Sequence, residues 1–271
     1  MTSNTQQFRG PNLWDALRVQ WNIIVAMMLR EMLLRYKTSK LGYLWSIIDP
    51  SLQIAVWYVI YTVLRAPKAF HDMPMPLFLG TGIVAYFCFK DVSNYVCGAI
   101  KSSRDLLQFP MVKQIDAFIS RFILESCTIL VVGFLTLGLV ILFGYGFFPR
   151  DSMGVISATF SLLLLGLGFG AFNAMLTSLW PVYGKLLPVL NRFLFFTSGA
   201  FMPVEHLPLA AREYLQWNPV LNGVELVRES WSYVYDPSMD YSRGYILLWG
   251  ACFFLVALLL EKRVLQEELG E

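Results

Sequence analysis

Six apolar stretches constrain this chain more than any other feature of its sequence. A helix that crosses the hydrocarbon core of a bilayer needs about 20 predominantly apolar residues. Stretches of this kind occur at 44–64, 77–100, 118–147, 155–180, 186–201 and 245–260. The last two are short, so we expect their helices to use flanking residues or to stand nearly upright. The sequence therefore predicts an all-α polytopic membrane protein, with residues 1–271 forming a single transmembrane domain of six spanning helices.

The composition indicates that lipid solvates much of the surface. Hydrophobic residues make up 56% of the chain and charged residues 15%, with a mean hydropathy of +0.55. Soluble domains carry about 25% charged residues. The net charge of +2 is too small to indicate a nucleic-acid partner. The first ten residues are polar and hold no short apolar core, so we expect no cleavable signal peptide.

The distribution of Lys and Arg predicts which helix ends face the cytoplasm. Basic residues concentrate in the cytoplasmic connections of membrane proteins. With the N-terminus inside, the cytoplasmic connections hold 14 Lys and Arg and the outer connections hold 6. We therefore expect both termini in the cytoplasm, as an even number of spans also requires.

The segment 13–40 is predicted to form a helix that does not cross the membrane. Its purely apolar run, 23–29, is far too short to span, and polar residues flank and interrupt it. Apolar residues recur at helical spacing, which favours a helix lying in the membrane interface with its basic side chains reaching the phosphates. Asp49 then fits a helix N-cap and Pro50 the first turn of the first span. The alternative is a soluble helix packed on the protein itself.

Two connections are too elaborate for simple turns. The cytoplasmic connection 101–116 carries apolar residues on an otherwise charged loop, which indicates either docking to another protein or a helix lying on the membrane. The outer connection contains two short helix patterns within 207–231, one opened by Pro208 and one by Asn218-Pro219. Neither can cross the bilayer. We expect a re-entrant helix pair before the last span, or else a folded outer cap.

The motifs that are missing narrow the function. No phosphate-loop motif occurs, so we expect no ATP, metal or other cofactor bound by this chain itself. The two histidines, His71 and His206, lie in outer connections, and the four cysteines lack metal-ligand spacing. A membrane-embedded enzyme is disfavoured because no catalytic constellation is present.

Few ionisable residues fall within the predicted spans. Arg121 and Glu125 lie four residues apart near the cytoplasmic end of the third span, so we expect them to pair with each other. Lys90 and Asp91 are adjacent and should point in different directions, toward a polar pathway or toward partners in the bundle. A secondary transporter should show more acidic residues at mid-depth and an inverted repeat, and neither is evident.

Aromatic residues provide the positive signal for a transport path. They lie on the first and fifth predicted spans. Tyr58 and Tyr61 are three residues apart on one face of the first span. Aromatic rings can stack on the apolar faces of sugars, so such residues could let a glycan slide, although aromatics also gather at membrane interfaces and in ordinary packing. The candidate path residues are Trp57, Tyr58, Tyr61, Phe195 and Phe196.

Three motifs in order resemble those of a known family. The run REMLLRYKTSKLGYLWSIIDP at 30–50 resembles the N-terminal signature of ABC exporter permeases of the capsular-polysaccharide and O-antigen type. The runs FFTSGAFMP at 195–203 and NPVLNGVELVRE at 218–229 resemble the end of the family's fifth span and its second signature. The resemblance covers nearly the whole chain and is closest to the capsule branch.

This resemblance implies a half-transporter in the bacterial inner membrane. Two copies of the chain would line one pathway, and two copies of a separate ATP-binding subunit, which holds ATP and Mg, would drive it. The cargo would be an acidic lipid-linked polysaccharide, handed to periplasmic and outer-membrane export proteins. By similarity, the 101–116 connection carries the helix that couples to the ATPase, with candidate residues Arg104, Asp105, Leu107, Phe109 and Lys113.

The charged patch at 30–40 is predicted to bind the cargo at the membrane surface. We expect it to recruit the anionic lipid head or sugar phosphate at the inner leaflet, through Arg30, Arg35, Tyr36, Lys37 and Lys40. Rival hypotheses are an ABC permease for O-antigen, teichoic acid or a small lipid, and, less favoured, a channel that works without ATP.

Overall fold

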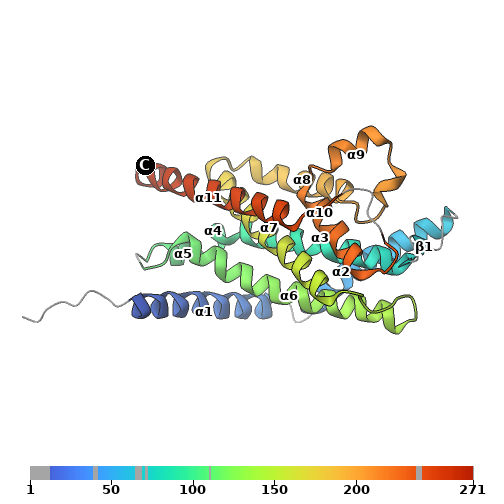
Figure 1. The fold of residues 1–271 in the computed structure, drawn as a ribbon. Coiled ribbons are helices and arrows are strands. Elements are labelled where there is room, and N and C mark those ends of the chain that lie inside the picture. Colours follow the sequence, from blue (N-terminus) through green and yellow to red (C-terminus); the bar gives the residue numbers. More distant parts are fainter. Residues whose placement is uncertain are drawn as a thin grey trace, which may run out of the picture.

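The computed structural model describes residues 13–38, 42–64, 69–70, 73–109, 111–235 and 240–270 and is almost entirely helical (Figure 1). A two-residue antiparallel ladder pairs β1 (Ala69–Phe70) with β2 (Met73–Pro74). The long helices are α1 (Leu13–Thr38), α2 (Gly42–Val63), α3 (Met75–Cys97), α6 (Gln114–Leu142), α7 (Ser152–Leu179), α8 (Tyr183–Thr197) and α11 (Arg243–Gly270). The short helices are α4 (Ala99–Ser102), α5 (Arg104–Leu107), the 3-10 turn η1 (Val204–His206), α9 (Leu209–Leu215) and α10 (Pro219–Trp231).

Five helices in the described part of the chain are long and apolar enough to cross a membrane. They are α2, α3, α6, α7 and α11, and they match the predicted spans at 44–64, 77–100, 118–147, 155–180 and 245–260. The predicted span at 186–201 corresponds to α8, which has 15 residues and contains Pro188. A helix of this length extends about 22 Å, less than the ~30 Å of a bilayer core. The sixth crossing therefore stays a prediction.

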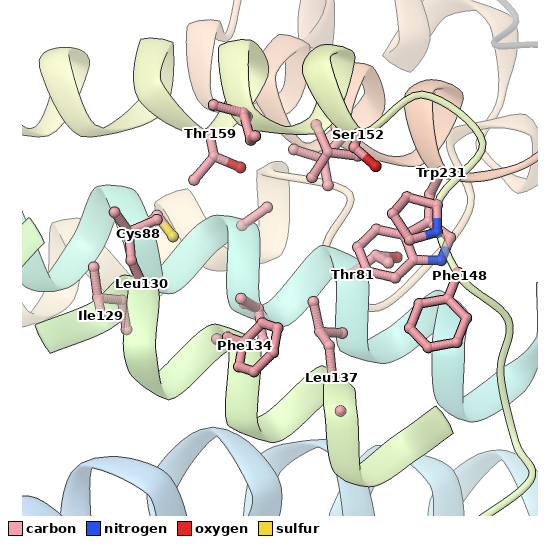
Figure 2. Close-up of a pocket in the computed structure, with 18 of the residues that line it drawn as sticks. Thr81, Cys88, Ile129, Leu130, Phe134, Leu137, Phe148, Ser152, Thr159 and Trp231 are labelled. Carbon is pink, nitrogen blue, oxygen red and sulfur yellow. The ribbon is translucent and has the colours of Figure 1, made fainter. Parts of the chain in front are cut away.

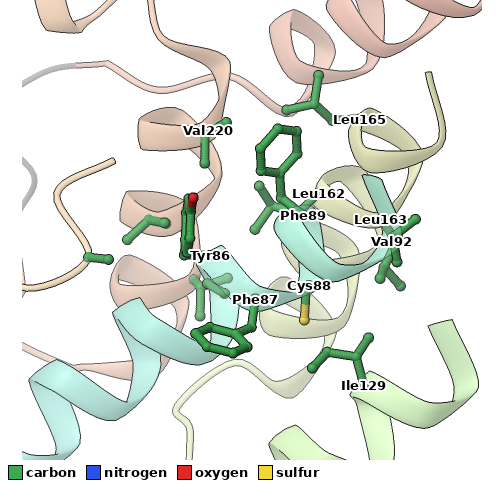
Figure 3. Close-up of a cluster of buried hydrophobic side chains, with 14 of the residues drawn as sticks. Tyr86, Phe87, Cys88, Phe89, Val92, Ile129, Leu162, Leu163, Leu165 and Val220 are labelled. Atoms are coloured by element: carbon green, nitrogen blue, oxygen red, sulfur yellow. The ribbon is translucent and has the colours of Figure 1, made fainter. Parts of the chain in front are cut away.

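Helix α3 forms the centre of the bundle. Seventeen of its 23 residues are buried, as expected for a helix that is apolar around most of its circumference. It packs against α2, α6, α7 and α10. Figure 3 shows rings and aliphatic side chains of α3 interleaving with side chains of α7, α6 and α10, among them Tyr86, Phe89, Val92, Leu162, Leu165, Ile129 and Val220.

Glycines bring α7 into close contact with helices on two sides. A Cβ atom at Gly166 would lie 2.8 Å from the carbonyl oxygen of Phe89 in α3. A Cβ atom at Gly168 would lie 2.0 Å from the carbonyl oxygen of Gly250 in α11. Small residues allow helix backbones to approach in a membrane, where association depends on packing contacts. These glycines fix the positions of α3 and α11 on α7.

Helix α2 starts before the predicted cap at Asp49. It begins at Gly42 and runs through Pro50, so the prediction that Asp49 caps a helix starting at Pro50 is wrong. The Ser51 hydroxyl donates to the carbonyl of Ile47 at 2.8 Å, next to the position where proline has no N–H. Hydroxyl bonds and small local adjustments of this kind let membrane helices tolerate proline.

Helix α1 runs beside the start of α6 and is not among the helices that are long and apolar enough to cross a membrane (Figure 1). Its Ile24 and Met27 are buried, while Trp14, Trp21 and several leucines are exposed. The Arg121 guanidinium of α6 lies 2.9 Å from the carboxylate of Glu31 in α1. The predicted pairing of Arg121 with a carboxylate on its own helix is thus replaced by a bond between helices. The in-plane orientation of α1 stays a prediction.

The two short helices of the outer connection form where the sequence predicts them. Pro208 precedes α9, and the Asn218 side chain caps α10 by accepting a hydrogen bond from the Val220 N–H at 2.9 Å. Helix α10 is buried along almost its entire length against α3 and α7. Its re-entrant depth in the bilayer stays a prediction.

Candidate functional site

A groove of about 530 Å³ opens between α2, α3 and α8. Its lining combines aromatic, aliphatic and basic side chains from all three helices: Leu52, Gln53, Val56, Trp57, Tyr86, Lys90, Asn191, Arg192, Phe195 and Phe196. The two outer helices that form its walls are largely exposed along their lengths, and α8 has no buried residue. The groove therefore lies on a free face of the bundle.

Aromatic rings line the end of the groove nearest α10. The Trp57 indole stacks on Phe201 with ring centroids 4.3 Å apart, and Tyr86 meets Phe195 edge to face at 5.1 Å. Phe195 and Phe196 both contact Phe201 at 5.5 Å. Offset and edge-to-face pairs of this kind stabilise one another beyond simple burial. The rings thus form a connected cluster rather than isolated contacts.

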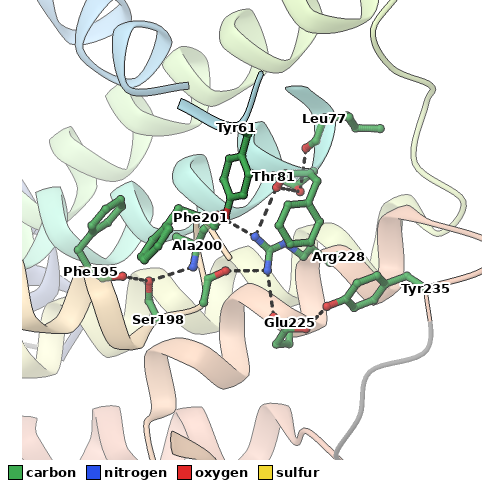
Figure 4. Close-up of polar contacts among 12 residues, drawn as sticks. Tyr61, Leu77, Thr81, Phe195, Ser198, Ala200, Phe201, Glu225, Arg228 and Tyr235 are labelled. Atoms are coloured by element: carbon green, nitrogen blue, oxygen red, sulfur yellow. Dashed lines mark hydrogen bonds and ion pairs between the residues drawn. The ribbon is translucent and has the colours of Figure 1, made fainter. Parts of the chain in front are cut away.

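The structure brings together four of the five predicted path residues. Trp57, Phe195 and Phe196 line the groove. The Tyr61 ring lies 6.4 Å from Trp57, and its hydroxyl donates to the carbonyl of Phe201 at 2.9 Å (Figure 4). Tyr58 instead lies beside Tyr145, which follows α6, so the structure does not place it in this cluster.

Two basic side chains stand at the other end of the groove. Arg192 is exposed on α8. The Lys90 ammonium lies 3.5 Å from the centroid of the Phe87 ring and 3.2 Å from the Asp91 carboxylate. Lys90 and Asp91 therefore turn toward each other, and the prediction that they diverge is wrong. Both keep about a fifth of their side-chain surface exposed, so Lys90 remains within reach of an anion in the groove.

The sequence reasoning did not select Gln53, Tyr86 or Arg192 as site residues. Each lies four residues from another lining residue of the groove, so the two side chains share one helix face. The pairs are Gln53 with Trp57, Tyr86 with Lys90, and Arg192 with Phe196. A search for polar residues one turn from the selected aromatics could have found Gln53 and Arg192. It could not have found Tyr86, because no residue of α3 had been selected as a path residue.

A buried arginine holds the segment that follows α8. Arg228 of α10 is fully buried and donates to the carbonyls of Gly199 and Ala200 at 2.9 and 2.7 Å (Figure 4). Its guanidinium also lies 3.0 Å from the Glu225 carboxylate and 3.7 Å from the centroid of the Phe78 ring. Gly199 has φ of +67°, a conformation that favours glycine. We call this set of contacts the Arg228 latch.

The latch is joined to the groove. The Tyr235 hydroxyl donates to Glu225, so the carboxylate has two partners. Burial raises the pKa of the Glu225 carboxyl above its ordinary value, and the nearby Arg228 guanidinium opposes that shift. Gly199 and Ala200 directly precede Phe201, which stacks on Trp57 in the aromatic cluster. Glu225 and Arg228 lie in the motif NPVLNGVELVRE at 218–229, but no role was predicted for them from the sequence. Two residues of opposite charge three positions apart, on one helix face, are the signal that could have indicated one.

The predicted coupling connection is exposed at the opposite end of the bundle from α9 (Figure 1). It consists of α4, α5 and a short loop before α6 begins at Gln114. Arg104, Asp105, Phe109 and Lys113 are exposed, and Leu107 is half-buried. Phe109 and Met111 expose 60% and 64% of their surface, far more than apolar side chains in a protein core. The connection therefore presents an apolar tip with a charged rim.

Hydrogen bonds tie this connection to α1. Asp116 accepts a bond from the Lys113 backbone N–H at 2.9 Å and another from the side chain of Gln20 in α1. Arg30, one of the predicted recruiting residues, is half-buried on the same helix. The side chains of three other predicted recruiting residues, and all of the fourth, lie outside the described residues: Arg35, Tyr36, Lys37 and Lys40.

Comparison with known proteins supplies the family context. The sequence model described as "ABC-2 type transporter" matches residues 23–231. The chain is 31% identical to the polysialic acid transport protein KpsM of Escherichia coli over 216 residues, 80% of this chain and 83% of KpsM. It is 27% identical to the capsule polysaccharide export inner-membrane protein BexB of Haemophilus influenzae over 249 residues, covering 92% and 93% of the two chains. It is 26% identical to the capsule polysaccharide export inner-membrane protein CtrC of Neisseria meningitidis serogroup B over 217 residues, covering 80% and 82%.

Proposed function

Because the chain belongs to the ABC-2 type transporter family, we propose that it is the membrane subunit of an ATP-driven exporter for an acidic, lipid-linked capsular polysaccharide. Two relatives that are capsule polysaccharide export inner-membrane proteins, and one that is a polysialic acid transport protein, support this cargo class. The observation that carries the proposal is the groove between α2, α3 and α8. It places aromatic rings and two cations along one free face of the bundle.

The chemistry of the groove suits an acidic glycan. The rings of Trp57, Phe195 and Phe196 offer flat apolar faces for sugar rings. Arg192 supplies an exposed positive charge, and Lys90, although paired with Asp91, keeps about a fifth of its side-chain surface exposed. A path through which a polymer advances needs contacts that are weak and repeated, since strong binding would stop the movement.

Two copies of the chain would complete the path. A groove of about 530 Å³ on an open face cannot enclose a polysaccharide. The outer surfaces of α2 and α8 expose apolar side chains along their lengths, including Leu52, Val56, Leu186, Val189 and Phe193. Apolar faces of helices in a membrane pack against lipid or against other helices, and in the proposed scheme these faces pack against a second copy of the chain. Pairing of two such faces would join two grooves into one enclosed passage.

The energy for export would come from a separate ATP-binding subunit that docks on the exposed connection at 99–113. Its apolar tip at Phe109 and its charged rim match the centre and edge of a protein interface. Because Gln20 and Glu31 of α1 bond to the start of α6, a push on the connection would also move α1. In the proposed scheme α1 recruits the anionic head of the cargo, and periplasmic and outer-membrane proteins receive the polymer.

The proposal is tested in a strain that lacks its own copy of this subunit. Plasmid-borne wild-type protein should restore surface polysaccharide, and an ATP-binding subunit should co-purify with it in equal amounts. Arg192→Gln should reduce surface polysaccharide. Lys185→Gln, a matched change of an exposed base on the same helix outside the groove, should not. Movement of polysaccharide by this chain alone in liposomes, with no nucleotide present, would refute the proposal.

A further inference from the structure

A second, larger cavity lies on a different side of the bundle. It has a volume of about 830 Å³ and sits between α6 and α7, with α3 as its floor and the end of α10 closing one side (Figure 2). Figure 2 shows Phe134 and Leu137 of α6 facing Ser152 and Thr159 of α7 across it, with Trp231 and Phe148 at one end. None of its lining residues belongs to the groove between α2 and α8.

The cavity exists because α6 and α7 each pack against α3 but make few contacts with each other. At Gly133 of α6, a Cβ atom would lie 2.8 Å from the side chain of Val84 in α3, so α6 and α3 are tightly packed there. At Gly138, one and a half turns further along α6, a Cβ atom would meet nothing within 4 Å. Gly138 lines the cavity. The missing side chain at this position leaves part of the space open.

The lining suits hydrocarbon rather than water or a polar ligand. Most lining residues are aliphatic or aromatic, and the polar exceptions are hydroxyls and a thiol. The Thr81 hydroxyl already donates within its own helix, to the carbonyl of Leu77 at 3.0 Å. A buried water needs two or more polar partners, and this lining offers few.

The dimensions suit an extended chain that follows the bundle axis. Lining residues on α6 run from Ile129 to Leu142, which corresponds to about 20 Å of helix. Half of a bilayer's hydrocarbon core is about 15 Å thick. The cavity is therefore long enough to hold one extended acyl chain of a single leaflet.

A cation stands at the end of the cavity where the α6–α7 connection meets α10. Pro149 lines the cavity, and the next residue, Arg150, is exposed. The Arg150 backbone N–H donates to the carbonyl of Trp231 at 3.1 Å, and its guanidinium lies 5.5 Å from the centroid of the Tyr233 ring. The neighbouring Asp151 turns its carboxylate back over the first turn of α7, where the partial positive charge of the helix end offsets it.

We propose that this cavity holds one acyl chain of an anionic phospholipid from the surrounding bilayer, with the headgroup phosphate at Arg150. The lipid would fill the space between α6 and α7 and supply the packing contacts that these two helices do not make with each other. The site depends only on the chain being in a membrane, so it stands or falls independently of the exported cargo.

The test uses the full chain expressed in a host that makes no capsule and reconstituted with phosphatidylglycerol carrying a diazirine in its acyl chain. After photolysis, mass spectrometry should locate the crosslinks on lining residues such as Val155 and the buried Leu163. Gly138→Phe should abolish these crosslinks by filling the cavity. The neighbouring Leu139→Phe, at an exposed position outside the cavity, should leave them unchanged. Gly138→Leu is a smaller substitution that serves if the Phe variant fails to elute as a monodisperse peak.

Two outcomes would overturn the proposal. One is an even spread of crosslinks over the exposed face of α6, which is the pattern of general bilayer lipid. The other is equal crosslinking in the Gly138 and Leu139 variants.

The assignment of the headgroup to Arg150 is tested separately. Wild-type protein should crosslink anionic lipid in preference to zwitterionic lipid, and Arg150→Gln should lose that preference. Equal crosslinking of both lipids by the wild-type protein would remove Arg150 from the site.

Discussion

Replacing Arg228 with methionine should destabilise the protein strongly, because it removes the centre of the Arg228 latch. Methionine approximates the length of the arginine side chain but carries no charge and donates no hydrogen bond. The change would leave the buried Glu225 carboxylate without its cation and three backbone carbonyls, of Phe78, Gly199 and Ala200, without their shared donor. Removing one partner of a buried ion pair costs about 3–5 kcal/mol, so the free energy of unfolding should fall by about this amount.

The measurement is the free energy of unfolding in mixed detergent micelles, obtained by titration with a denaturing detergent. Arg243→Met serves as the control, because Arg243 is exposed at the start of α11, and it should change the free energy little. Glu225→Gln removes the buried negative charge that would lack a cation, and it keeps an oxygen that can accept a hydrogen bond from the Tyr235 hydroxyl. The double variant of Arg228 and Glu225 should therefore lose less stability than the two single variants together, with a coupling energy of about 0.5–3 kcal/mol.

Two results would refute this reasoning. The first is a loss below about 1 kcal/mol in the Arg228→Met variant, the value typical of an ordinary neutral hydrogen bond. The second is strict additivity of the two substitutions, which would mean that the guanidinium and the carboxylate do not depend on each other. Loss of export in a variant that keeps its stability would assign the latch a role in movement rather than in folding.

Three further predictions address the proposed path, recruitment and coupling. Trp57→Ala should lower export by breaking the aromatic cluster, whereas Val59→Ala, at an exposed position on the same helix outside the groove, should not; equal surface polysaccharide in the two strains would count against the path. Replacing Arg35 and Lys37 together with alanine should abolish export while membrane insertion and co-purification of the ATP-binding subunit persist; normal export would contradict the recruiting role. Phe109→Asp should weaken docking of that subunit by about 2 kcal/mol or more, the cost of losing a central apolar contact, which is roughly 30-fold in dissociation constant; unchanged co-purification would remove this residue from the interface.

The latch and the groove together relate the charged motif on α10 to the transport path. Arg228 holds the backbone of Gly199 and Ala200, and the next residue, Phe201, stacks on Trp57. Tyr61 of α2 holds the carbonyl of Phe201 from the other side. Any rearrangement that widens the groove at this end must move a segment anchored on both sides. We therefore expect the latch to restrict separation of α2 and α8 at the end nearest α10.

The sequence by itself determined the features that depend on local composition. Runs of apolar residues located five helices able to span a bilayer, because a helix in lipid must satisfy its backbone bonds internally and present hydrocarbon outward. The Asn218-Pro219 pair located the start of α10, because its cap is made by the residues next to it. The same local reasoning failed at Pro50, where the helix continues through the proline.

Only the tertiary structure decided which side chains meet. Trp57, Tyr86 and Phe195 lie on three different helices, and periodicity shows which face each occupies but not which faces adjoin. Arg121 pairs with Glu31, 90 positions away, instead of with the carboxylate one turn along its own helix. Arg228 reaches carbonyls 28 and 29 positions away. Long-range contacts of this kind follow from helix packing through small residues such as Gly168, and that packing depends on the whole bundle rather than on any one stretch of sequence.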